Sequence, residues 1–356
     1  MNKKILQIID ILDPGGTERV FVDLCNILNR YGKDVSVLFT REPGILSNQL
    51  NENIHQISLN RKFRYSFIAI LRLFIILRSY EIIHIHGRYN FFYVKMIMIF
   101  FPLRKWKVYF HDHYGAIEID QSVPLFFRLV TKNYNYIGVS KSLTDWAYFK
   151  LGLKNKQIFY LSNIRDIDPV NDFKQRDELK KNKTFELVQV SNIHPIKNIE
   201  FSLRLLCKLK EKEKVRLSIY GKISDINYFK SLTILSKSLN LEEDLIFIHD
   251  QLNIPSILHK YDLGLCTSKS ESGPLVLIEY LSRGLPFVSY RTGEVVSQLT
   301  NEYPFFIIDN FDREGWVNRI KEINENKLFQ KVNLISTYNK LFSYKSYYNN
   351  LKTIYK

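Results

Sequence analysis

Short apolar segments alternate with amphipathic segments along most of this chain, and this alternation restricts the possible fold more than any other feature. The apolar segments have the length of single β-strands, and the segments between them have the period of helices. Strands joined through helices pair in parallel, and the helices cover the faces of the sheet. The sequence therefore predicts an α/β fold. The predicted strands are residues 4–10, 34–40, 81–87, 107–113 and 136–140 in the first half, and 185–191, 215–221, 245–250, 263–268 and 286–290 in the second.

The alternation occurs in two sets, which indicates two Rossmann-like domains. The 356 residues exceed the usual size of one hydrophobic core. Residues 163–186, between the two sets, are polar, charged and interrupted by Pro169, as is typical of a connection between domains. We place the domains at residues 1–165 and 166–338, followed by a segment at 339–356.

Nothing in the sequence indicates secretion or a membrane span. The N-terminal residues contain no small-residue cleavage site. The apolar stretches 67–77 and 91–103 are shorter than the roughly 20 residues that a spanning helix needs, and they carry Arg72 and Lys95. We expect a cytoplasmic protein with reduced, buried thiols, because its cysteines are far apart and lie in apolar segments. These are Cys25, Cys207 and Cys266.

The net charge of +15 is concentrated in the first half of the chain, where residues 1–165 contain 23 Lys and Arg against 12 Asp and Glu. Bases interleaved with aromatic residues suit an anionic membrane surface, so we expect peripheral binding to the inner face of the cell membrane. A solvated helix face is the alternative. The charge also permits nucleic-acid binding, but the sequence contains no recognised motif for it. The bases that are interleaved with aromatic residues lie between residues 61 and 107 and are Arg61, Lys62, Arg64, Arg72, Arg78, Arg88, Lys95, Arg104, Lys105 and Lys107.

The segment SESGPLVLIEYLSRGLP, residues 270–286, sets two carboxylates around the start of a predicted helix. Pro274 suits the opening of this helix, and Gly284 suits its end. Glu271 would then lie where free N–H groups and the helix dipole favour an anion. Glu279 would lie about a turn and a half further along. Charge compensation at the helix end is the alternative interpretation.

The order of Glu, small residue, Gly, Pro, aliphatic run, Glu and Gly-x-Pro in this segment resembles the Glu-x7-Glu motif of retaining glycosyltransferases of family 4, which have the GT-B fold. The resemblance implies two Rossmann-like parallel-sheet domains with an interdomain cleft, the first binding the acceptor and the second the donor. It implies that the segment 339–356 is a helix that packs back on the first domain. The implied partners are a UDP- or GDP-sugar and a glycan or lipid-linked oligosaccharide, in polysaccharide biosynthesis without a metal.

The resemblance assigns roles to residues of the second domain. Glu271 would hold hydroxyls of the transferred sugar, and Glu279 would accept hydrogen bonds from the ribose. Lys197 would bind the donor diphosphate, close to Asn192, which stands where the family usually has Arg. Such preorganised donors would stabilise the charge on the departing diphosphate. The further donor-binding residues are Ser272, Gly273, Pro274, Leu275 and Val276.

Two features of the first domain complete the predicted site. Gly15 and Gly16 join the first strand to the first helix, where the backbone can approach a phosphate closely; a plain tight turn is the alternative. His111 lies at the carboxyl end of a predicted strand, the edge at which such sheets bind ligands. The resemblance places His111 near the donor sugar, with His113 as its rival.

Several alternatives stay open. His84, His86, His111 and His113 form two His-x-His pairs that could bind a metal, but the resemblance implies none and favours structural roles for His84 and His86. A nucleotide-sugar epimerase would use the same scaffold. A nucleic-acid-binding protein and a catalytically silent assembly partner are candidates from other classes. Ser272 departs from the family pattern and leaves the nucleotide open, and Asn192 leaves open the silent partner.

Overall fold

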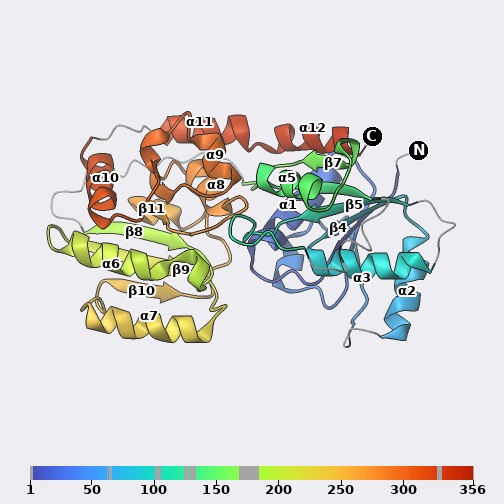
Figure 1. The fold of residues 1–356 in the computed structure, drawn as a ribbon, viewed down its shortest axis with the longest axis horizontal. Helices are drawn as coiled ribbons and strands as arrows, with labels where there is room; N and C mark the ends of the chain where they lie inside the picture. Colours follow the sequence, from blue (N-terminus) through green and yellow to red (C-terminus); the bar gives the residue numbers. More distant parts are fainter. Residues whose placement is uncertain are drawn as a thin grey trace. The chain divides into compact units, whose positions relative to one another are not determined.

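The computed structural model describes residues 3–61, 63, 66–100, 106–123, 127, 134–167, 184–326 and 331–355. The chain forms two compact units, one of Met1–Asp166 with Tyr344–Lys356 and one of Ile167–Ser343. Each unit contains one parallel sheet with helices packed against it (Figure 1). The predicted fold class is therefore confirmed. Most of the predicted connection, residues 168–183, lies outside the described residues.

The first unit is built on a seven-stranded sheet in the order β3-β2-β1-β4-β5-β6-β7. All neighbouring strands are parallel. The sequence predicted the five central strands but not the short edge strands β3 and β7, whose side chains are half-buried or exposed. The strands are β1 (Ile5–Ile9), β2 (Val35–Phe39), β3 (His55–Ser58), β4 (Ile82–His86), β5 (Lys107–Asp112), β6 (Asn135–Gly138) and β7 (Ile158–Tyr160).

Helices cover both faces of this sheet. One apolar core joins α1 and α12 to Ile5 and Ile9 of β1, and the other joins α2, α3 and α5 to Leu6 and Ile8. This division follows from the alternation of side chains along a strand. The helices are α1 (Gly16–Arg30), α2 (Phe67–Leu77), α3 (Arg88–Ile99), α5 (Lys141–Phe149) and α12 (Tyr344–Ile354), with short helices η1 (Ile45–Gln49) and η2 (Asn155–Gln157).

The last helix, α12, belongs to the first unit although it ends the chain. The ring of Tyr348 stacks on Tyr31, which caps α1, with centroids 3.6 Å apart. Tyr109 of β5 donates from its hydroxyl to the carbonyl oxygen of Ile354 at 2.7 Å. Leu351 is fully buried in the α1 side of the core. The sheet and α1 together therefore provide the surface on which α12 packs.

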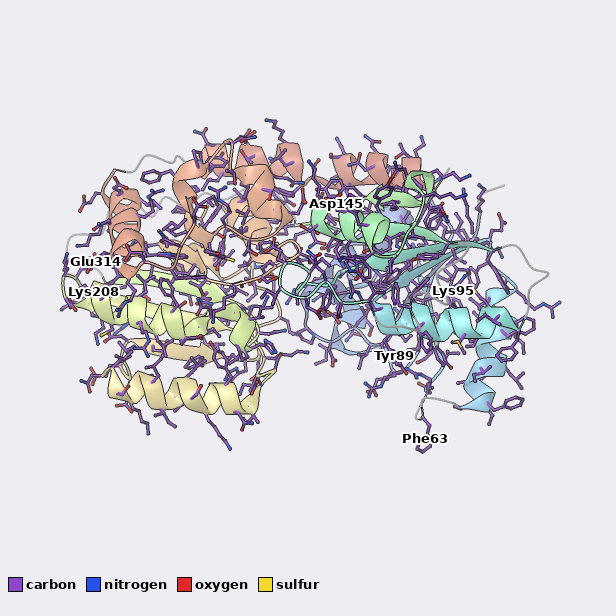
Figure 2. All side chains as sticks on the ribbon, viewed as in Figure 1. Phe63, Tyr89, Lys95, Asp145, Lys208 and Glu314 are labelled. Carbon is purple, nitrogen blue, oxygen red and sulfur yellow. The ribbon has the colours of Figure 1, made fainter. Side chains whose placement is uncertain are left out.

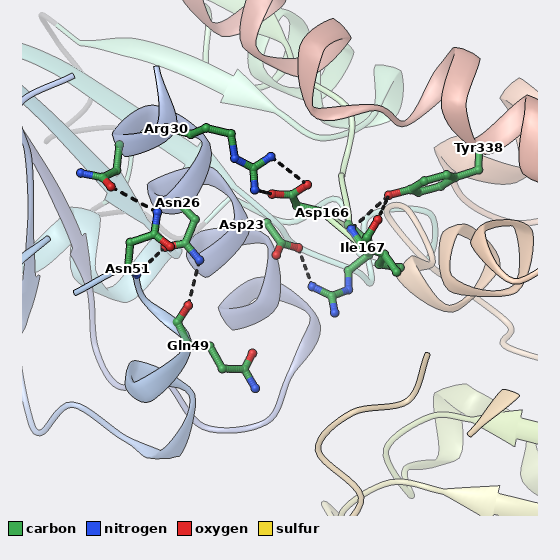
Figure 3. Close-up of polar contacts among 10 residues, drawn as sticks. Asp23, Asn26, Arg30, Gln49, Asn51, Asp166, Ile167 and Tyr338 are labelled. Atoms are coloured by element: carbon green, nitrogen blue, oxygen red, sulfur yellow. Dashed lines mark hydrogen bonds and ion pairs between the residues drawn. The ribbon is translucent and has the colours of Figure 1, made fainter. Parts of the chain in front are cut away.

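Two ion pairs join Arg165 and Asp166, the last residues of the first unit's long segment, to α1 (Figure 3). Arg165 donates to Asp23 at 2.5 Å, and Arg30 donates to Asp166 at 2.7 Å. Burial raises the pKa of Asp23 to about 6, although the Arg165 guanidinium acts in the opposite direction. The Asp23–Arg165 pair is buried, so removal of either partner would leave an uncompensated charge in the interior.

The second unit is built on a six-stranded parallel sheet in the order β10-β9-β8-β11-β12-β13. Its strands are β8 (Phe185–Val190), β9 (Val215–Tyr220), β10 (Leu245–Ile248), β11 (Leu263–Cys266), β12 (Phe287–Tyr290) and β13 (Ile307–Ile308). Its helices are α6 (Ile199–Lys210), α7 (Ile226–Ser238), α8 (Leu275–Ser282), α9 (Glu294–Leu299), α10 (Arg313–Asn326) and α11 (Lys331–Leu341), with short helices η3 (Pro195–Lys197), η4 (Leu258–Lys260) and η5 (Pro304–Phe306).

Two further expectations concern the thiols and the membrane. All three cysteines are free, and Cys25 and Cys266 are buried, which raises the pKa of Cys266 to about 11. In the described parts of the chain, no helix combines the length and the hydropathy that crossing a bilayer requires.

Candidate active site

Lys197 lies at the carboxyl edge of the second sheet, in η3, after strand β8. Asn198 has a left-handed backbone (φ 53°), and α6 begins at the next residue. Thr267, just after the neighbouring strand β11, donates from Oγ1 to the Lys197 carbonyl oxygen at 3.0 Å. Gln189 of β8 donates in turn to Thr267 Oγ1 at 3.1 Å. The backbone of Lys197 is therefore held by the ends of two adjacent strands.

Glu271 lies in the loop between β11 and α8, and the loop before α9 supports it. The backbone N–H of Glu271 donates to Thr292 Oγ1 at 3.0 Å. Gly293 has a φ of +78°, and a Cβ added to it would lie 2.9 Å from Pro274 Cδ and 3.0 Å from Glu271 Cβ. A side chain at position 293 would therefore be strained by its backbone conformation and would also push against the Glu271 loop.

The side chains of Lys197 and Glu271 meet at this edge. Lys197 Nζ lies 2.5 Å from Glu271 Oε1, and the two side chains keep 22% and 16% of their surface exposed. Both residues were predicted as site residues from sequence, but their direct contact was not. The ammonium carries three donors and the carboxylate accepts at both oxygens, so each can bind a ligand while it holds its partner.

Helix α8 begins at Leu275, one residue after Pro274. Pro274 has an extended backbone (φ −66°, ψ 109°), so it precedes the helix instead of forming its first turn. The N–H groups of Leu275 and Val276 are then the first in the helix, and helix geometry gives them no acceptor within it. The side chains of Leu275 and Val276 are partly buried, whereas Ser272 and Gly273 are buried.

The remaining predicted residues of the second unit lie nearby along the chain, with different exposure. Glu279 is the fifth residue of α8 and is only 3% exposed, so it is far less accessible than Glu271. Asn192 is partly buried in the loop after β8. A Cβ on Gly221 would lie 2.1 Å from the Ser191 carbonyl oxygen, so glycine at 221 allows this loop to pack closely.

In the first unit, Gly15 is the cap residue of α1, and Gly16 is its first residue. The backbone of Gly15 is extended (φ −165°), which any residue can adopt. A Cβ at Gly15 would meet the Glu18 carboxylate, 2.2 Å away, and Gly16 is exposed. The Glu18 carboxylate therefore lies against the Gly15 turn at the start of α1.

His111 lies in a row of stacked histidine rings at the carboxyl side of the first sheet. It pairs in register with His86 of β4, and its ring centroid lies 5.2 Å from that of His84 and 4.2 Å from that of His113. His111 is fully buried, and neither of its ring nitrogens has a hydrogen-bond partner among the described residues. His113 is partly exposed. In this conformation a ligand can therefore reach His113 more readily than His111.

Burial keeps these histidines neutral. It lowers the pKa of His84 and of His113 to about 3, and the effect on His84 is reinforced by His113. Burial also holds the pKa values of His86 and His111 well below their ordinary range, with the neighbouring histidines acting in the same direction. Neutral imidazoles have one donor and one acceptor each, so their hydrogen bonds decide which nitrogen carries the proton.

The possible ligand nitrogens of His84, His86 and His111 lie within 4.8 Å of one another. Tetrahedral zinc, with Zn–N distances of about 2.1 Å, would draw such nitrogens to roughly 3.4 Å. The rings of His84 and His86 stack at 23° with centroids 4.5 Å apart, and both nitrogens of His86 already bond to protein groups. These residues do not fit a zinc site without rearrangement.

The sequence did not predict several residues that support the candidate site residues. Thr267, Thr292 and Gly293 hold Lys197 and Glu271, yet nothing in the local pattern separates them from ordinary loop residues. Gln7 is different: it is a fully buried amide in the middle of the apolar strand β1. A polar residue at a core position of a strand is a signal that could have identified it.

Two family models match this chain and together cover most of it. Residues 14–168 match the model described as Glycosyltransferase Family 4, and residues 170–341 match the model described as Glycosyl transferases group 1.

Individual proteins are similar over different spans. N-acetyl-alpha-D-glucosaminyl L-malate synthase of Bacillus anthracis is 28% identical over 31% of this chain and 28% of its own length. The Escherichia coli UDP-Gal:alpha-D-GlcNAc-diphosphoundecaprenol alpha-1,3-galactosyltransferase is 23% identical over 44% of this chain and 41% of its own. The crystal structure of Anabaena HepE in complex with UDP and glucose has the same fold, with a TM-score of 0.81, 17% identity and 99% coverage of both chains. This likeness confirms the GT-B fold.

Proposed function

We propose, from the premise that this chain belongs to the group 1 and family 4 glycosyltransferases, that it transfers a sugar from a nucleotide-sugar donor to a glycan or lipid-linked acceptor, with retention of anomeric configuration. The observation that carries the proposal is the contact between Lys197 and Glu271 beside the start of α8. It joins a cation, a carboxylate and the first N–H groups of a helix, which have no acceptor within that helix, at one edge of the sheet. We propose a role in polysaccharide biosynthesis at the cell surface.

The proposed donor site lies in the second unit. Departure of a nucleoside diphosphate places negative charge on phosphate oxygens and positive character on the sugar ring. Lys197 and the N–H groups of Leu275 and Val276 would stabilise the phosphate charge. Glu271 would bind sugar hydroxyls and face the cationic ring. The bond from Thr267 to its carbonyl oxygen fixes the backbone of Lys197, and the contact with Glu271 holds its ammonium group in place for this role.

The other predicted residues take narrower roles. Glu279 would accept hydrogen bonds from the ribose. Ser272 and Asn192 would line the phosphate region, where the hydroxyl and amide can donate without adding charge. In the first unit we propose that His111 and His113 act on the sugar being transferred, with the partly exposed His113 making the contact.

The relatives suggest which substrates to test first. The name of the E. coli relative specifies a UDP-sugar donor and a lipid diphosphate acceptor, and HepE was crystallised with UDP and glucose. We therefore propose a UDP-sugar donor ahead of a GDP-sugar, and a lipid-linked acceptor ahead of a free glycan. No divalent metal is required under this proposal, because the charge on the diphosphate is met by Lys197 and backbone N–H groups.

We further propose that the surface of α2 binds the membrane that carries such an acceptor. Phe67, Ile68, Leu71 and Ile75 follow one stripe of α2 and are 70%, 71%, 43% and 63% exposed. Phe63, just before the helix, projects from the same part of the first unit (Figure 2) and is 76% exposed. An apolar stripe in a basic domain suits insertion between anionic headgroups, so the proposal places the protein on the inner membrane face.

The decisive experiment supplies the purified chain with a panel of UDP- and GDP-sugars, with and without lipid-linked acceptors, in excess chelator. We expect acceptor-dependent release of UDP and a new glycoside with the anomeric configuration of the donor. An interconverted nucleotide sugar without acceptor would identify an epimerase instead. Thermal stabilisation by UDP without turnover of any pair would favour the silent assembly partner, and turnover that needs an added divalent ion would contradict metal independence.

A further inference from the structure

A chain of hydrogen bonds runs beneath the histidines of the first unit, from the end of the polypeptide to the edge of the sheet. Gln7 of β1 lies at its centre. Gln7 Nε2 donates to the Tyr355 hydroxyl at 3.0 Å, and that hydroxyl lies 2.5 Å from His84 Nδ1. On the other side, Gln7 Oε1 lies 3.0 Å from His86 Nε2. His86 Nδ1 then lies 3.1 Å from His113 Nε2.

The chemistry of an amide gives this chain a direction. An amide has a donor end and an acceptor end, so the two neighbours of Gln7 must present opposite groups to it. Because Oε1 faces His86, Nε2 of His86 must carry a proton. A neutral His86 then has a bare Nδ1, which can only accept, so His113 must donate from Nε2. It follows that Nδ1 of a neutral His113 is the acceptor nitrogen of that ring.

We propose that Gln7 is a positioning residue that sets the tautomer of His113 through His86, so that Nε2 of His113 carries the proton and Nδ1 is its acceptor nitrogen. Gln7 is fully buried, and its Oε1 reaches His86, which in turn reaches His113, so Gln7 acts on the site through His86. Such an acceptor suits a hydroxyl group of a sugar and does not suit a phosphate oxygen. This inference rests on the proposed function for its consequence in catalysis, but not for the tautomers themselves.

The packing around the chain keeps this arrangement in place. Phe21 of α1 meets the His86 ring edge-on, with centroids 4.8 Å apart. The rings of His86 and His113 stack at 18°. Among the described residues, the hydrogen-bond partners of Gln7, His84 and His86 are uncharged: an amide, a phenol and imidazoles. The tautomers of this buried group are therefore decided by hydrogen bonding between neutral groups.

The test reads the ring nitrogens directly. The full chain has eight histidines, so histidine-selective ¹⁵N labelling gives a spectrum in which protonated and bare ring nitrogens separate. For the wild type without substrate we expect Nε2–H on both His86 and His113. In Gln7→Met the acceptor for His86 is lost, and we expect both rings to become mixtures of tautomers. Tyr347→Phe is the control, because that hydroxyl lies in the same unit and is buried without a hydrogen-bond partner among the described residues.

Transferase kinetics supply the second measurement. In Gln7→Met we expect kcat to fall by about tenfold or more, as for other partners that orient a histidine, with the donor KM little changed. Nδ1–H on His113 in the wild type would overturn the proposal even if Gln7→Met failed to fold. Unchanged tautomers, or changed tautomers with an unchanged kcat, would overturn it as well. A wild type with no transferase activity would instead remove the proposed function, while the ring spectra would still decide the tautomers.

Discussion

Lys197 Nζ lies 2.5 Å from Glu271 Oε1, and this contact joins two loops that are 74 residues apart in the chain. Each loop follows a strand of the same parallel sheet, and β8 and β11 are direct neighbours. The carboxyl ends of adjacent parallel strands lie at one edge, so residues just beyond them meet. The contact gives the proposed donor site a cation and an anion that are already positioned before a ligand binds.

The first prediction concerns this pair. Lys197→Met should lower donor-dependent transfer by about 100- to 1000-fold, because a preorganised donor at the departing phosphate is lost. Glu271→Gln should lower it comparably while retaining a similar shape. The control is Lys269→Met, which removes an exposed ion pair with Glu200 and should leave kcat within about twofold. Full activity in either site variant would refute the assignment.

The second prediction concerns the glycine that supports Glu271. Gly293→Ala should reduce stability by about 1 to 3 kcal/mol and reduce transfer, because the added Cβ meets Pro274 and Glu271 at a left-handed backbone position. Gly152→Ala is the matched control: it has a φ of +66° but nothing within 4 Å of the added Cβ. It should cost stability without loss of activity. Equal losses of activity in both variants would show that contact with the Glu271 loop is not the cause.

The third prediction concerns acid stability. The pKa of His84 is about 3 in the folded protein against 6.5 when exposed, so the unfolded chain binds more protons between these values. The contribution of His84 to stability is therefore complete above about pH 6.5 and is lost as the pH falls toward 3. At pH 5 the loss should be about 2 kcal/mol. Denaturant unfolding of the wild type and of His84→Gln at pH 7 and pH 5 measures this share.

The comparison needs variants at two positions. His84→Gln should reduce the change in stability between pH 7 and pH 5 by about 2 kcal/mol, since one titrating group is gone while His86, His111 and His113 still titrate. His55→Gln alters an exposed histidine at the start of β3 and should leave the change as in the wild type. A wild type equally stable at both pH values would contradict the neutral, buried state of these rings.

The fourth prediction concerns the membrane surface of α2. Ile68→Glu should weaken binding to anionic liposomes at least about tenfold, because it puts a charge into the apolar stripe and repels the headgroups. Ile234→Glu on α7 is the control, since Ile234 is 70% exposed against 71% for Ile68. Co-sedimentation at about 50 mM salt measures both, and the wild type should be released as salt rises. Equal effects of the two variants would exclude a specific role for α2.

The sequence alone determined the fold class and the central strands of each sheet, because buried parallel strands appear as short apolar runs between helices. It did not indicate β3, β7 or β13, since such short edge strands take their identity from the neighbour with which they pair. Segment 270–286 predicted Glu271 as a site residue, and the family resemblance predicted Lys197. Both lie in the segments that follow apolar strands, where the chain reaches the edge of a sheet.

Only the tertiary structure decided which groups touch. The Lys197–Glu271 contact, the close fit of Gly293 and the chain through Gln7 join residues that are distant in sequence, and no local pattern specifies such pairs. The structure also decided accessibility: His111 is fully buried, whereas His113 is partly exposed. Periodicity shows which side of a strand a residue occupies, but exposure at the end of a strand depends on what packs over it. For that reason the residue types indicated the kind of chemistry, whereas only the folded structure showed which residues are in contact.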